Sequence, residues 1–95
     1  MQSRSDFPWH WTRVTETTLV HTGPGTMHTI VINDIDDGAT ITLYDGVDAG
    51  GAVIGVLITA LHQPVTLIYD LMFDDGLYIA IAGQEAFAEL TVNWM

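Results

Sequence analysis

The chain has 95 residues, no cysteine and a formal net charge of −10, with two basic residues against twelve acidic ones. The lack of cysteine excludes disulfides, thiolate metal ligands and a cysteine nucleophile, and the negative charge argues against nucleic acids and anionic membranes as partners. Hydrophobic residues make up 48% of the chain and charged residues only 15%, which predicts a folded domain that keeps some apolar surface for contact with another chain.

Residues 1–13 are predicted to form an extended N-terminal arm that differs chemically from the rest of the chain. The arm holds both basic residues and two of the three tryptophans, and Pro8 favours an extended backbone before it. Two interpretations stay open: the aromatic rings cover one end of the domain's own core, or they dock on another subunit, where tryptophan is enriched. In the second case the expected contact residues are Arg4, Phe7, Trp9, Trp11 and Arg13.

From residue 14 to the C-terminus, apolar and polar residues alternate with the period of a half-buried β-strand. Polar turns rich in glycine and aspartate recur about every ten residues, which is typical of a sandwich or barrel. We therefore expect an all-β domain over residues 14–95, an antiparallel, jelly-roll-like β-sandwich of about seven to eight strands. The segments that carry the pattern are Thr17–Thr22, Thr26–Asn33, Ala39–Tyr44, Ala52–Thr59, Val65–Phe73, Leu77–Ala82 and Phe87–Trp94. Strict alternation in Ala52–Thr59 puts Ile54, Val56 and Ile58 on one face.

Two histidines, His21 and His28, flank the turn Gly23-Pro24-Gly25. If this turn is a tight hairpin, their Cβ atoms lie roughly 5 Å apart on neighbouring strands, close enough to share a metal ion. The sequence supplies no third ligand, so a pair that merely fills space is the favoured interpretation, and no metal site is predicted.

The acidic stretch Asp34–Gly38 invites comparison with a calcium loop. An EF-hand needs glycine at the sixth position, but the sixth residue counted from Asp34 is Ala39. Asp45 and Asp48 could join such a site across loops, although ordinary turn chemistry explains all of these aspartates. We expect no bound cofactor.

Catalytic residues are equally hard to assign. The only serines, Ser3 and Ser5, lie in the predicted arm, and there is no lysine or cysteine to act as a nucleophile. Among the tyrosines, alternation turns Tyr69 inward and Tyr44 and Tyr78 outward on different strands, where a sugar-stacking role is rarer than a core or interface role. The chain is therefore not expected to be an enzyme.

Four stretches of strand sequence resemble a family of small tailed-phage virion proteins. The family pattern is a glycine turn followed by LH-x-IVVN, then TITLYD, and late in the chain GL-x-[IV] followed by LTV-x-[YW]. The resemblance covers about residues 14–94, and the departures are Met27, where leucine is commoner, and the aromatic arm. The matching stretches are Thr22–Asn33, Ala39–Asp45, Gly76–Gly83 and Ala88–Trp94.

The resemblance implies a β-sandwich without catalytic residues that decorates or cements the outer surface of a phage head. The expected partner is the major capsid protein, and the acidic surface suits a face turned away from packaged DNA. A homotrimer would fit a three-fold junction of the shell. Met1–Asp6 does not begin a signal peptide, so we expect synthesis in the host cytoplasm before incorporation into the virion. The alternative is a carbohydrate-binding or adhesion module of a phage fibre or tail.

Overall fold

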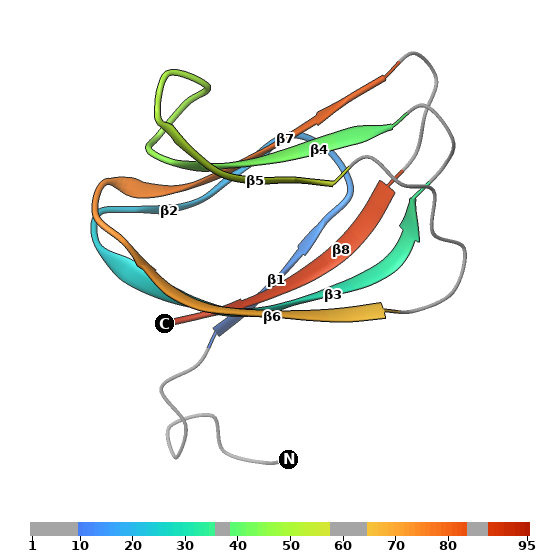
Figure 1. Ribbon diagram of the computed structural model, residues 1–95, viewed down its shortest axis with the longest axis horizontal. Helices are drawn as coiled ribbons and strands as arrows, with labels where there is room; N and C mark the ends of the chain where they lie inside the picture. Colours follow the sequence, from blue (N-terminus) through green and yellow to red (C-terminus); the bar gives the residue numbers. More distant parts are fainter. Residues whose placement is uncertain (1–9, 36–38, 58–64, 84–87) are drawn as a thin grey trace.

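Two four-stranded antiparallel sheets pack face to face in the computed structural model (Figure 1), which describes residues 10–35, 39–57, 65–83 and 88–95. The described residues contain no helix, so the predicted all-β sandwich is confirmed. Its strands are β1 (His10–Val14), β2 (Thr18–Thr22), β3 (Gly25–Ile35), β4 (Thr40–Asp45), β5 (Ala52–Leu57), β6 (Val65–Phe73), β7 (Gly76–Ala82) and β8 (Ala88–Trp94).

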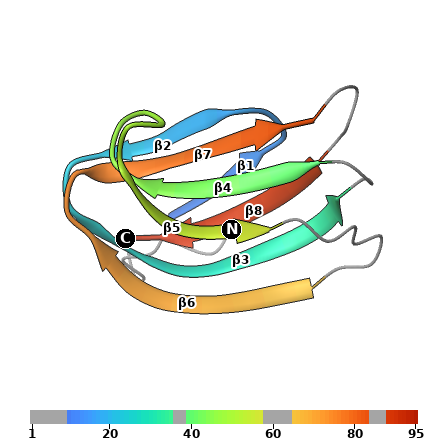
Figure 2. The same cartoon turned by 45° about the horizontal axis from the view of Figure 1, so that its top comes forward.

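The strand order is β1-β8-β3-β6 in one sheet and β2-β7-β4-β5 in the other. Among the described strands, β4 and β5 are the one consecutive pair that are neighbours in a sheet, and every other connection crosses between the layers. The first strand pairs with the last, from His10 opposite Trp94 to Val14 opposite Leu90. Eight strands wound between two sheets in this order form a jelly roll, and Figure 2 shows the two layers from a second direction.

The core lies between the sheets and is built mostly from every second residue of the strands, as alternation predicts. In β3 two register shifts interrupt the alternation, between Met27 and Thr29 and between Ile32 and Asp34. Each large side chain removed from water contributes roughly 1.5–3 kcal/mol of gross stabilisation. The largest fully buried side chains are Phe73, Met27, Ile30, Ile32, Ile35, Ile41, Leu43, Leu77, Ile79, Leu90, Val14 and Val92.

Strand β5 departs from strict alternation. Its register against β4 shifts between Leu43 and Tyr44, which leaves Ile54 without an opposite residue. Beyond this bulge Val56 points to solvent and Leu57 packs against the core. The expectation that Ile54 and Val56 share a face is therefore wrong, because one extra residue reverses the order of sides along a strand. Ile58 lies outside the described residues.

The sheet also begins earlier than expected. Residues 10–13, which the sequence assigns to the arm, belong to β1 and pair with β8 along their whole length. Thr12 accepts a hydrogen bond from Trp94 Nε1 at 3.0 Å, which ties this strand to the C-terminal one. The boundary at residue 13 therefore falls inside a strand, and residues 1–9, with Arg4, Phe7 and Trp9, lie outside the described residues.

Candidate contact surfaces

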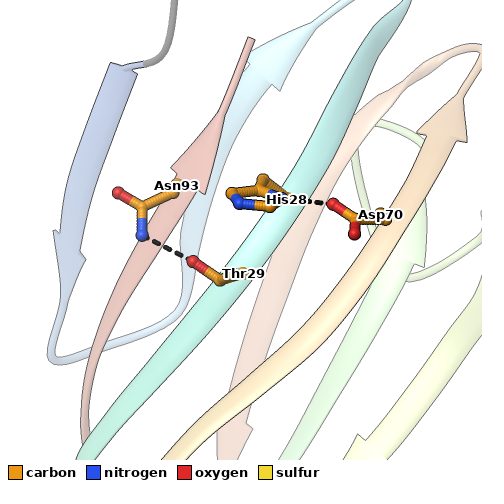
Figure 3. Close-up of polar contacts among 4 residues, drawn as sticks. All are labelled: His28, Thr29, Asp70 and Asn93. Atoms are coloured by element: carbon orange, nitrogen blue, oxygen red, sulfur yellow. Dashed lines mark hydrogen bonds and ion pairs between the residues drawn. The ribbon is translucent and has the colours of Figure 1, made fainter.

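The outer face of the sheet β1-β8-β3-β6, which we call the Trp11 face, carries one of the predicted contact residues. Register places Trp11, Asn93, Thr29 and Ile68 in one row across all four strands. Trp11 is 55% exposed at one edge and Ile68 is 71% exposed at the other. Between them Asn93 Nδ2 donates a hydrogen bond to Thr29 Oγ1 at 2.6 Å (Figure 3). The row is thus apolar at both ends and internally hydrogen-bonded at its centre.

Arg13, the second predicted contact residue on this face, is engaged within the chain. Its Nη2 lies 2.7 Å from Glu89 Oε2, and its Nε donates to the same oxygen at 2.9 Å. Both side chains remain partly exposed, so solvent screens the pair and its contribution to stability is small. A partner that uses the Arg13 guanidinium would have to share it with Glu89.

A second polar contact on the Trp11 face joins β3 to the edge strand β6, where His28 Nδ1 contacts Asp70 Oδ1 (Figure 3). Here Tyr69 and Asp70 of β6 lie opposite the single residue His28 of β3. Asp70 takes up the extra length in a left-handed conformation with φ of 46°, which aspartate tolerates better than most residues. Such a bulge interrupts the outer hydrogen-bonding edge of the strand and discourages pairing with a foreign strand.

The outer face of the other sheet, β2-β7-β4-β5, has a different character, and we call it the uncharged face. Register aligns Leu19, Tyr78, Tyr44 and Val53 in one row across its four strands. The Tyr44 and Tyr78 ring centroids lie 6.0 Å apart, inclined by 49°. The remaining outward side chains in the described parts of these strands are Ala80, Thr42, Val56, Ala82, Thr40 and Thr22.

The uncharged face exposes much of its apolar area. Leu19 is 43% exposed, Val56 50% and Val53 59%. The sequence indicated that Tyr44 and Tyr78 point outward, but their adjacency depends on the pairing of β4 with β7. The row that they form with Leu19 and Val53 was missed because none of the four residues is close to another in the chain.

His21 and His28, proposed as possible cross-strand partners, lie on different sheets. Strand β2 pairs with β7 while β3 pairs with β6 and β8, so the turn at Gly23 carries the chain across the sandwich. The hairpin assumption is therefore wrong, and with it the shared metal site. A turn of this composition serves a crossover as well as a hairpin, because glycine supplies the positive φ in both, here 97° at Gly23.

His21 instead belongs to a cluster of rings at one end of the sandwich. Its ring centroid lies 4.6 Å from that of Trp94 and 5.9 Å from that of Phe73, and His10 covers Trp94 from β1 at 4.7 Å. The end of the core is thus closed by Trp94, whereas Trp11 of the predicted arm lies on the outer surface. Sequence reasoning missed this cluster because its members come from both ends of the chain.

The aspartates considered for calcium act as caps of turns where the structure describes them. The Asp45 carboxylate accepts hydrogen bonds from the backbone N–H groups of Asp74 and Asp75, at 3.0 and 2.8 Å, and these bonds lower the pKa of Asp45. Asp48 Oδ1 accepts from the N–H of Gly50 at 2.8 Å. The described residues hold no group of three or more histidines and acidic side chains able to bind a metal ion. Asp36 and Asp37 lie outside the described residues.

No helix long and apolar enough to cross a membrane occurs in the described part of the chain. Comparison with known protein families, with characterised proteins and with solved structures finds no match to this chain.

Proposed function

We propose that this protein is a virion structural subunit that decorates or cements the head of a tailed phage by binding the outer surface of the major capsid protein. The observation that carries the proposal is the position of Trp11, which stands exposed on the first strand of a jelly-roll sandwich, directly after the segment that holds Arg4, Phe7 and Trp9. Jelly rolls are common in capsid proteins and lectins, a likeness of architecture that does not by itself assign a function.

The proposed mechanism is mechanical. A subunit that binds assembled capsid protein, and binds the disassembled form less well, stabilises the shell by mass action. Trp11 would supply the central apolar anchor, because tryptophan buries up to about 250 Å². Covering the exposed part of this side chain removes about 130 Å² from water, which corresponds to about 3 kcal/mol. Arg4, Phe7 and Trp9 would extend the same contact toward the N-terminus.

Charge supports an outward position on the particle. A chain with net charge −10 is repelled by packaged nucleic acid and is suited to a surface that faces solvent. On the Trp11 face the Arg13–Glu89 pair offsets part of that charge locally. The Trp11 face is therefore repelled by an acidic partner less strongly than the net charge of −10 would suggest.

The test is cosedimentation of the purified protein with heads assembled from the major capsid protein of the phage that encodes it. The wild type should bind, and Trp11→Ala should weaken binding by more than tenfold, in line with the area it would bury. Met72→Ala changes an apolar residue that is even more exposed than Trp11, at 76%, on the opposite edge strand. It is the control and should bind as the wild type does. Absence of wild-type binding, or equal loss in both variants, would refute the proposal.

The second candidate is a carbohydrate-binding or adhesion module, which the adjacent rings of Tyr44 and Tyr78 favour. Sugar hydroxyls also need polar partners beside the rings, and the outward positions described on that face offer only the hydroxyls of threonine and tyrosine. A thermal-shift screen with mono- and oligosaccharides separates the two candidates, since the decoration role predicts no shift with any sugar.

A further inference from the structure

The uncharged face stands out because the chain is otherwise so acidic. The sequence has fourteen charged residues and net charge −10, yet none of the ten outward side chains described on β2, β7, β4 and β5 is charged. Solvated surfaces normally mix charges of both signs. A face that exposes Leu19, Val53 and Val56 without any charged residue between them has the composition of a contact surface.

We propose that this uncharged face is the surface through which copies of this chain contact one another. Two copies at −10 repel each other, so they associate most easily where no carboxylate of one meets a carboxylate of the other. The uncharged face meets this condition. The Trp11 face does not meet it, because it carries the carboxylates of Asp70 and Glu89 and only Glu89 is paired with an arginine.

The arrangement of side chains on this face suits a self-complementary contact. Its row runs from Leu19 through Tyr78 and Tyr44 to Val53, with two rings at the centre and an aliphatic side chain at each end. When such a row meets its own copy about a two-fold axis, the tyrosines meet near the centre and each aliphatic end meets the other. The four strands lie side by side in Figure 2, so the row is continuous across the sheet.

The size of the face sets the strength of the contact. Four strands about 4.8 Å apart and six residues of about 3.3 Å each give roughly 400 Å² per copy. A standard stable interface covers about 800 Å² per partner. We therefore expect weak self-association, with a dissociation constant in the micromolar range or above. Many copies bound to one particle would raise the local concentration of the chain and so favour this contact.

Self-association is measured on the purified chain alone, so its outcome does not depend on the proposed capsid role. Sedimentation velocity from about 1 µM to about 1 mM should show the average mass rising above the 10.4 kDa of one copy. Association should strengthen in 1 M salt, where the Debye length falls to about 3 Å and the repulsion between copies is screened.

Two matched variants locate the contact. Val53→Glu on β5 and Ile68→Glu on β6 each add one negative charge at an exposed, outward position of an edge strand, and circular dichroism checks that both remain folded. Val53→Glu should raise the dissociation constant at least tenfold, whereas Ile68→Glu should change it less than twofold. A wild type that stays monomeric throughout, or a loss of association in Ile68→Glu that equals or exceeds that in Val53→Glu, overturns the proposal. A monomeric chain whose binding to heads is abolished by Val53→Glu would assign this face to the capsid protein and also overturn it.

Discussion

The hydroxyl group of Tyr69 on β6 lies against the backbone of Gly55 on β5, so that a Cβ atom added at Gly55 would come within 3.0 Å of Tyr69 Oη. The two strands are edges of opposite sheets, and this contact closes one side of the sandwich. Burial raises the pKa of Tyr69, as expected for a phenol held away from water. The glycine makes room for the ring that seals the core.

The first prediction tests this contact with a double-mutant cycle. Gly55→Ala should destabilise the protein by about 1 kcal/mol, because the new methyl group would lie 3.0 Å from Tyr69 Oη, a tight contact that the ring must shift to relieve. In a Tyr69→Phe background the same change should be neutral or slightly stabilising, since alanine restricts the unfolded chain and no hydroxyl stands in its way. Urea unfolding of the four proteins gives the coupling energy, and equal effects of Gly55→Ala in both backgrounds would disprove the contact.

The second prediction concerns Asp45, whose carboxylate caps the turn between β6 and β7 through the N–H groups of Asp74 and Asp75. These bonds lower its pKa from the ordinary value of 3.8. A carboxylate with a lowered folded-state pKa stabilises the protein above the unfolded-state pKa, and this stabilisation is lost as the pH falls through the folded-state value. Asp45→Asn should therefore be less stable than the wild type at pH 7, and the difference should shrink below about pH 4.

Urea unfolding at pH 7 and in steps below pH 4 measures this difference. Asp48→Asn is the control, because Asp48 caps its turn with one hydrogen bond to Gly50 rather than with bonds to two N–H groups. At pH 7, Asp48→Asn should lower the free energy of unfolding by less than Asp45→Asn does. A stability difference between Asp45→Asn and the wild type that is constant from pH 7 to the acid limit would contradict the proposed role of the carboxylate.

The third prediction contrasts two tryptophans on the paired strands β1 and β8, Trp11 opposite Asn93 and Trp94 opposite His10. Trp94 stacks between His10 and His21 and packs against the core, so Trp94→Ala should destabilise the protein by about 3 kcal/mol or more. Trp11 stands on the outer surface, and Trp11→Ala should cost less than about 1 kcal/mol. Thermal unfolding of both variants is the measurement. A larger loss of stability in Trp11→Ala than in Trp94→Ala would contradict the placement of Trp94 against the core and of Trp11 on the surface.

Much of the fold could be predicted because the side of a strand on which a residue lies is a local property. The alternating sequence of Thr40–Asp45 is enough to predict its buried face, with Ile41 and Leu43 inward and Tyr44 outward. The reason is that successive side chains of a pleated backbone point to opposite sides. The same reasoning gave the sandwich class and the inward positions of β6, from Val65 to Phe73. It failed at Ile54, because a bulge depends on how the neighbouring strand is aligned.

Which strands pair with one another was decided only by the tertiary structure. The turn at Gly23 is compatible with a hairpin or a crossover, and only the pairing of β2 with β7 selects the crossover. Trp11 and Arg13 belong to a sheet only because β8, almost eighty residues later, supplies their partners. By itself the sequence determined that the molecule is acidic and, outside the bulge in β5, which side chains of strands such as β4 and β6 are inward. The tertiary structure decided that Leu19, Tyr78, Tyr44 and Val53 form one uncharged surface, because backbone pairing between distant strands, and not any local preference, sets which outward residues become neighbours.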